Sequence, residues 1–190
     1  PATDRQTYSQ KDFKRAKVLV VVFTCNSCPY AVDYEDRIIR LARQAEAADA
    51  QVKVVAINVN LVAEDLLPAM KERANKKQFN FPYLFDKSQE SARGYGASYT
   101  PEFFVLNQER KIAYMGALDD STDPKKASRN YVQEAIEAVL MDELPEVTET
   151  VAIGCRVRFQ RKRRSRRRTN IKKSIPSPKV GEKPAPSSAE

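Results

Sequence analysis

Histidine is absent from the 190-residue chain, and cysteine occurs only three times. Without an imidazole the chain cannot build a Ser-His-Asp or Cys-His catalytic site, nor the common zinc sites that combine cysteine with histidine. Three cysteines are also too few for a scaffold of several disulfides, and one short of a four-cysteine structural zinc site. A reactive thiol in this chain must therefore be activated without a histidine base.

The sequence also lacks any apolar run of about 18 residues, so we expect no transmembrane helix. No charged-then-apolar signal segment opens the chain. These absences leave the compartment open, since the protein could work in the cytoplasm or be exported with its signal already removed.

Basic residues are distributed unevenly, although the net charge of the whole chain is +8. Residues 160–190 hold 11 Lys or Arg and 2 Glu, a net charge of +9, which leaves −1 for residues 1–159. The run R-K-R-R-S-R-R-R and the Pro- and Ser-rich segment after it cannot bury enough apolar surface to fold. We therefore predict a domain over 1–159 and a disordered basic tail over 160–190, which would attract nucleic acid or anionic membranes non-specifically.

Hydrophobic patterning predicts an α/β fold. Apolar, β-branched runs predict buried strands over 17–24 and 52–59, and a helical period over 28–48 joins them. A strand, a helix and a second strand form a β-α-β unit, which implies a parallel pair. The remaining predicted elements are helices over 63–77 and 88–95, a hairpin of strands 102–106 and 111–115, and a last helix with Asp123 as N-cap and Pro124 as its first residue.

Cys25 and Cys28 form a C-x-x-C motif at the end of the first predicted strand, where the first helix begins. Open α/β sheets place their sites at this end of the strands. The N–H groups and dipole of a helix N-terminus stabilise a thiolate, and such cysteines can have pKa values of about 3.5–7.5, against about 8.5 for a free thiol. We therefore expect Cys25 to be the exposed nucleophile and Cys28 the resolving thiol, an interpretation that requires Cys25 to be accessible to solvent.

Motifs along the chain resemble one family when they are taken together. They are V-V-V-F-T-C-N-S-C-P-Y-A, V-A-I-N-V-N, F-P-Y-L-F-D, Y-G-A-S-Y-T-P-E-F-F-V-L, Y-M-G-A-L-D-D and I-G-C. This set resembles the peroxiredoxin-like redoxins of the alkyl-hydroperoxide-reductase/thiol-specific-antioxidant group that carry a thioredoxin-type C-x-x-C, over about residues 7–159. The resemblance implies a thioredoxin-like three-layer α/β/α sandwich whose mixed sheet combines a parallel β-α-β unit with a C-terminal antiparallel hairpin and helix.

The resemblance also implies roles for individual residues. It makes Cys25 the attacking thiol, Cys28 its resolving partner, and Thr100-Pro101 a cis-proline loop that faces the disulfide and holds a substrate backbone. Asn26 and Ser27, which stand between the cysteines, are further candidates for contact with substrate.

The chain departs from the family pattern in ways that bear on mechanism. Leu19 stands where thioredoxins carry a buried acid, so proton transfer must use water or another carboxylate. Thr24 replaces the usual Trp before the motif, and Asn26-Ser27 replaces Gly-Pro. The peroxidatic signature P-x-x-x-T-x-x-C is absent, which weighs against a peroxidase.

Cys155 has two open roles, either a small core residue or a third redox thiol that accepts the disulfide from Cys25 or Cys28. The first functional hypothesis is a thiol–disulfide oxidoreductase that acts on protein or small-molecule disulfides. It would need no metal or organic cofactor and would draw electrons from a separate dithiol donor. One alternative is an antioxidant thiol peroxidase, in which peroxide oxidises Cys25 to a sulfenic acid that condenses with Cys28. Another is a non-catalytic redoxin fold with a polybasic binding tail.

Overall fold

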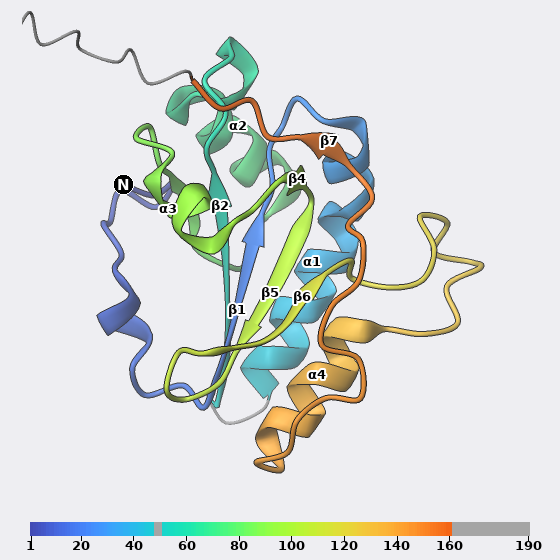
Figure 1. Cartoon of the computed structure of the whole chain (residues 1–190). Coiled ribbons are helices and arrows are strands. Elements are labelled where there is room, and N and C mark those ends of the chain that lie inside the picture. Colours follow the sequence, from blue (N-terminus) through green and yellow to red (C-terminus); the bar gives the residue numbers. More distant parts are fainter. Residues whose placement is uncertain (48–50, 161–190) are drawn as a thin grey trace, which may run out of the picture. The chain divides into compact units, whose positions relative to one another are not determined.

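The computed structural model of the protein describes residues 1–47 and 51–160, and a five-stranded mixed sheet lies at its centre (Figure 1). In sheet order the strands are β3 (Tyr83–Phe85), β2 (Val52–Asn58), β1 (Val18–Phe23), β5 (Glu102–Leu106) and β6 (Ile112–Gly116). Strands β1, β2 and β3 run parallel, whereas β5 is antiparallel to both β1 and β6. The predicted β-α-β unit and the predicted hairpin are therefore both present.

Both faces of the sheet are buried, because every residue of β1 is apolar and buried. Side chains alternate between the two faces of a strand. The three residues from Val18 at alternate positions join a core with α1 (Pro29–Ala47), α2 (Leu67–Lys77) and α4 (Tyr131–Leu140). The three from Leu19 join a second core with α3 (Glu90–Tyr95). Helices on both faces of the sheet give the three-layer α/β/α arrangement (Figure 1).

The last helix begins later than the sequence predicts, at Tyr131 and not at Pro124. The N–H of Ala127 donates to the carbonyl oxygen of Asp123 at 3.1 Å, so that segment forms only a short turn. Asn130 is the true N-cap of α4, because its Oδ1 accepts a hydrogen bond from the N–H of the residue at helix position three at 2.9 Å.

Several short elements complete residues Pro1–Phe159, which form one compact unit. They are the 3-10 turns η1 (Gln10–Phe13) and η2 (Ala63–Asp65), and the paired strands β4 (Tyr99–Thr100) and β7 (Cys155–Arg156). The predicted helix over 63–77 is thus divided into η2 and α2. Within the described residues no helix is both long and apolar enough to cross a membrane. Apart from residue 160, the predicted disordered tail lies outside the described residues.

Candidate active site

Cys25 and Cys28 lie between the carboxyl end of β1 and the first turn of α1, the location expected from the sequence. Cys28 directly precedes Pro29, the first residue of α1, and its carbonyl oxygen accepts a hydrogen bond from the N–H of Val32 at 3.0 Å. Pro29 suits its position because the first turn of a helix has no intrahelical use for the N–H that proline lacks. The motif thus stands at the amino end of a 19-residue helix.

Neither cysteine of the motif is exposed. Cys25 and Cys28 are each 2% exposed, and with Ala31 they form a small buried cluster against which Cys155 packs. The Sγ atom of Cys25 lies 3.4 Å from Oγ1 of Thr100. In its thiol form, Cys28 donates a hydrogen bond to the carbonyl oxygen of Thr100 at 3.1 Å. The expectation of an exposed Cys25 is therefore wrong, because Thr100 and Cys155 pack against the pair.

The two sulfurs of the motif differ in their affinity for a proton. The Cys25 thiol donates a hydrogen bond to Cys28, and further donors are the Cys155 thiol and the backbone N–H of Ala31, so the pKa of Cys28 lies well below its usual value. The pKa of Cys25 is raised by its hydrogen bond to Cys28, by burial and by the negative charge of Asp65. The pKa of Cys25 thus lies above the usual thiol value and that of Cys28 below it, whereas the sequence predicts a lowered pKa for Cys25. The role of Cys25 as the attacking thiol stays a prediction.

A buried carboxylate, Asp65, holds the middle of the motif. Its Oδ1 accepts hydrogen bonds from the N–H groups of Asn26 at 2.6 Å and Ser27 at 3.1 Å, and its Oδ2 accepts one from the hydroxyl of Ser27 at 2.5 Å. Asp65 is 0% exposed and belongs to η2, which follows β2. It is not among the candidates predicted from the sequence. The one indication in the sequence was Leu19, which stands where thioredoxins carry a buried acid, so that proton transfer would use water or another carboxylate.

Asn26 and Ser27 are both bonded within the chain. The Nδ2 group of Asn26 donates to the carbonyl oxygen of Glu64 at 2.8 Å, and its Oδ1 accepts a hydrogen bond from the Tyr83 hydroxyl at 3.0 Å. Ser27 is exposed at the surface, although its hydroxyl is bound to Asp65. These bonds hold the loop between the cysteines in one conformation. Contact of Asn26 and Ser27 with a substrate stays a prediction.

The Thr100-Pro101 peptide bond is cis, the geometry that the family resemblance implies. Thr100 is the second residue of β4 and pairs antiparallel with Cys155 of β7. Gly154 permits this close approach, because a Cβ atom there would collide with the carbonyl group of Thr100. Strand β7 thus pairs with β4, and β4 contains Thr100, which by the resemblance holds the backbone of a substrate. Substrate binding by Thr100 and Pro101 stays a prediction.

Cys155 is brought to the C-x-x-C motif from the far end of the domain. It is half-buried, and so the most exposed of the three cysteines. Burial, followed by the hydrogen bond that its thiol makes with Cys28, raises the pKa of Cys155 to about 11. Its place beside Cys28 distinguishes it from an ordinary core cysteine, while its redox role stays a prediction. Across the described ranges 1–47 and 51–160, no group of three or more His, Cys, Asp or Glu side chains could hold a metal ion.

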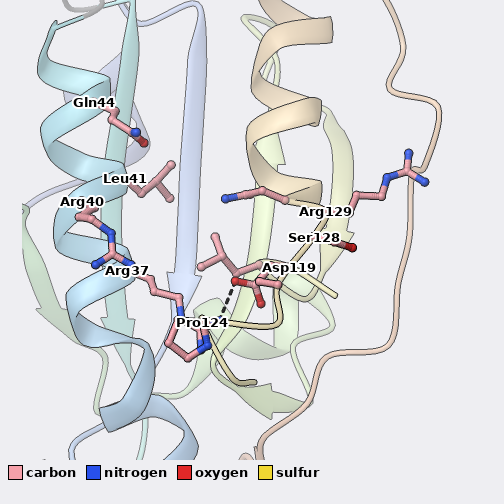
Figure 2. Close-up of a pocket in the computed structure, with 11 residues that line it drawn as sticks. Arg37, Arg40, Leu41, Gln44, Asp119, Pro124, Ser128 and Arg129 are labelled. Carbon is pink, nitrogen blue, oxygen red and sulfur yellow. Dashed lines mark hydrogen bonds and ion pairs between the residues drawn. The ribbon is translucent and has the colours of Figure 1, made fainter. Parts of the chain in front are cut away.

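A pocket of about 270 Å³ is lined by α1 and by the loop before α4, and none of the cysteines lines it (Figure 2). Arg37 forms a buried ion pair there with Asp119, with Nη1 and Oδ2 2.6 Å apart. The same guanidinium donates to the carbonyl oxygens of Ser121 and Thr122. These bonds tie the loop after β6 to α1, so Arg37 and Asp119 hold the scaffold and do not face the cysteines.

Comparisons with known proteins agree with this architecture. A family model described as Redoxin matches residues 1–132. A hypothetical protein of Sinorhizobium meliloti has a solved structure that is 29% identical, covers 84% of this chain and 89% of its own, and superposes with a TM-score of 0.77. An uncharacterized conserved protein of Geobacillus kaustophilus is also 29% identical, over 85% of this chain and 90% of its own, with a TM-score of 0.77.

A more distant structure identifies the fold. The solution structure of a thioredoxin-like protein in its oxidized form is 15% identical, covers 73% of this chain and 87% of its own, and has a TM-score of 0.57. This likeness confirms the predicted thioredoxin-like fold. None of the curated proteins matches the chain.

Proposed function

The chain belongs to the redoxin family, and from this premise we propose that it is a thiol–disulfide oxidoreductase with Cys25 and Cys28 as its redox pair. Membership of the family makes it a thiol redox protein in general terms. The observation that carries the finer proposal is the buried cluster in which Cys25 and Cys28 pack together at the start of α1. Two cysteines in such contact can form a disulfide with little movement of the backbone.

The reduced pair enters the exchange as one thiolate and one thiol. The thiolate attacks a partner disulfide, forms a mixed disulfide and expels one partner sulfur, which takes the proton of the remaining thiol. The second sulfur of the pair then displaces the other partner sulfur and closes the Cys25–Cys28 disulfide. The partner gains two electrons and leaves as one thiol and one thiolate. A separate dithiol donor returns the protein to its reduced state.

Burial limits which partners the pair can meet directly. With Cys25 and Cys28 each 2% exposed, a protein disulfide cannot reach either sulfur in the arrangement described. Exchange with such a partner requires that β7 and the Thr100 loop move aside, or that a better exposed thiol carries the exchange outward.

Reduction of insulin disulfides by the full chain, with dithiothreitol as the electron donor, tests the proposal. We expect Cys25→Ser and Cys28→Ser each to lower the rate by about 100-fold or more, because two residues that act as a unit fail together. Ser128→Ala is the control and should keep the rate, since its hydroxyl contacts Asp120 and no cysteine. Insulin reduction that survives both cysteine substitutions would refute the proposal.

The same variants separate the two alternatives. Peroxide consumption that requires Cys25 and is faster than insulin reduction would identify a thiol peroxidase. A polybasic binding module would be identified if the biological function of the protein persists when Cys25 and Cys28 are both replaced by serine but is lost when residues 160–190 are deleted.

A further inference from the structure

Cys155 stands between the buried pair and solvent. It packs against the cluster of Cys25 and Cys28, yet it is half-buried where they are each 2% exposed. Its backbone is held in place, because Cys155 lies opposite Thr100 in the β4–β7 pair and its carbonyl oxygen accepts a hydrogen bond from the Thr100 hydroxyl at 3.4 Å. The carbonyl oxygen of the same Thr100 lies 3.1 Å from Sγ of Cys28. Thr100 therefore contacts both Cys28 and Cys155, one through its carbonyl oxygen and the other through its hydroxyl.

Resting on the proposed function, we propose that Cys155 is a third redox thiol, which exchanges with the Cys25–Cys28 disulfide and carries it outward as a Cys28–Cys155 disulfide. In this step the Cys155 thiolate attacks the sulfur of Cys28. The Cys28–Cys155 bond forms and the Cys25–Cys28 bond breaks. Cys25 leaves as a thiolate and takes up the proton that Cys155 gave up. The protein neither gains nor loses electrons, so this exchange needs no further oxidant.

A partner dithiol can then react at the more exposed sulfur. One partner thiolate attacks Cys155 and expels Cys28, which is a good leaving group because the Cys25 thiol and the N–H of Ala31 stabilise its anion. The second partner thiolate displaces Cys155 and completes a partner disulfide. One proton of the partner passes to Cys155 and the other to solvent, because Cys28 leaves as the thiolate of the reduced pair, and the protein is reduced by two electrons. The reverse sequence reduces a partner disulfide.

The surroundings of Cys155 favour its attack at the stage where the relay needs it. In the reduced site its pKa is raised by burial, and next by the hydrogen bond to Cys28 and the negative charge there. The hydrogen bond to the Cys28 anion and the effect of its negative charge are both lost when Cys28 is bonded to Cys25, because a disulfide sulfur carries no charge. Cys155 is therefore a better nucleophile toward the oxidised pair than it is in the reduced site.

Disulfide mapping in three full-length variants tests the relay. Each variant is equilibrated in glutathione redox buffers, alkylated and digested for mass spectrometry. Cys25→Ser should form the Cys28–Cys155 bond. Cys28→Ser is the matched control, because it also retains two thiols. Its Cys25–Cys155 bond should form with an equilibrium constant reduced by at least about tenfold, because Cys28 is the sulfur beside Cys155. Cys155→Ser should close the Cys25–Cys28 bond.

The outcomes separate this inference from the proposed function. The relay is refuted if Cys25→Ser keeps both thiols unlinked in buffers that close the Cys25–Cys28 bond of Cys155→Ser. Equal yields of intramolecular bonds in Cys25→Ser and Cys28→Ser would refute it as well. A Cys155→Ser variant that cannot close Cys25–Cys28 would refute the proposed function instead.

The unsubstituted chain provides a readout that does not depend on how well the variants fold. After partial oxidation it should yield a peptide with an internal Cys25–Cys28 bond, and two peptides joined by a Cys28–Cys155 bond. Complete absence of the second link, with the first one present, would overturn the relay and leave the oxidoreductase proposal intact.

Discussion

Substitution of Asp65 tests whether a buried carboxylate holds the C-x-x-C loop. Asp65→Ala removes the acceptor of four donors, the N–H groups of Asn26 and Ser27, the hydroxyl of Ser27 and the Nδ2 group of Asn58. Asp65→Asn keeps a carbonyl oxygen for the two N–H groups and offers its amide to the hydroxyl. Glu64→Ala, at the adjacent residue, is a matched control because that side chain is exposed and only its backbone carbonyl binds Asn26.

The magnitude follows from the donors that lose their acceptor. A buried donor left without a partner costs about 1–3 kcal/mol, and hydrogen bonds to charged groups lie toward the upper end of that range. Ser27 is exposed, so its two donors can turn to water, whereas Asn26 is half-buried and bears more of the loss. The Nδ2 group of Asn58 keeps the backbone carbonyl of residue 65 and the Tyr83 hydroxyl as acceptors. We therefore expect Asp65→Ala to lower the free energy of unfolding by about 2–4 kcal/mol, and Asp65→Asn by about 1–2 kcal/mol.

Two measurements check this prediction. Urea unfolding of the reduced protein, followed by circular dichroism, gives the change in stability. Alkylation of Cys25 as a function of pH gives the second readout, because removal of the Asp65 charge should lower the pKa of Cys25. If Asp65→Ala lies within about 0.5 kcal/mol of Glu64→Ala, which is the usual range for surface substitutions, the carboxylate does not hold the loop.

Asp119→Ala should lower the free energy of unfolding by about 3–5 kcal/mol in urea titrations, because it leaves the Arg37 guanidinium buried without its partner; a loss below about 1 kcal/mol would contradict this. Gly154→Ala should disrupt the β4–β7 pair, because the added Cβ meets the carbonyl of Thr100, and mapping should then find less of the link between Cys28 and the thiol in β7; an unchanged yield would argue against the pairing. Stability should fall as the pH rises from about 10 toward 12, because burial raises the pKa of Tyr114 to about 12 from 10.0. Such a group adds stability that is fully present below the pKa of the unfolded state and is lost as the pH rises through the folded value. Equal urea midpoints at pH 8 and 11 would contradict the expectation.

Local patterns in the chain were sufficient for the β-α-β unit, the hairpin and the position of the motif. The apolar, β-branched run over 17–24 predicts a strand covered on both faces, and the 3.6-residue period after Cys28 predicts a helix; both are present. Their order along the chain then placed Cys25 and Cys28 at the carboxyl end of β1. Periodicity reports burial over a short window, which is why these predictions held. The capping signal at Asp123 failed, because a single-turn cap and a helix cap look alike in sequence.

The long-range contacts determine the chemistry of the site, and no local pattern encodes them. Asp65 reaches the loop of Cys25 from the turn after β2. Cys155 reaches Cys28 because β7 pairs with β4. Those contacts bury Cys25, raise its pKa and lower the pKa of Cys28, whereas a helix N-terminus alone would lower the pKa of Cys25. A thiol pKa depends on the donors, charges and solvent around one sulfur, and residues far apart in the chain supply most of them only after folding.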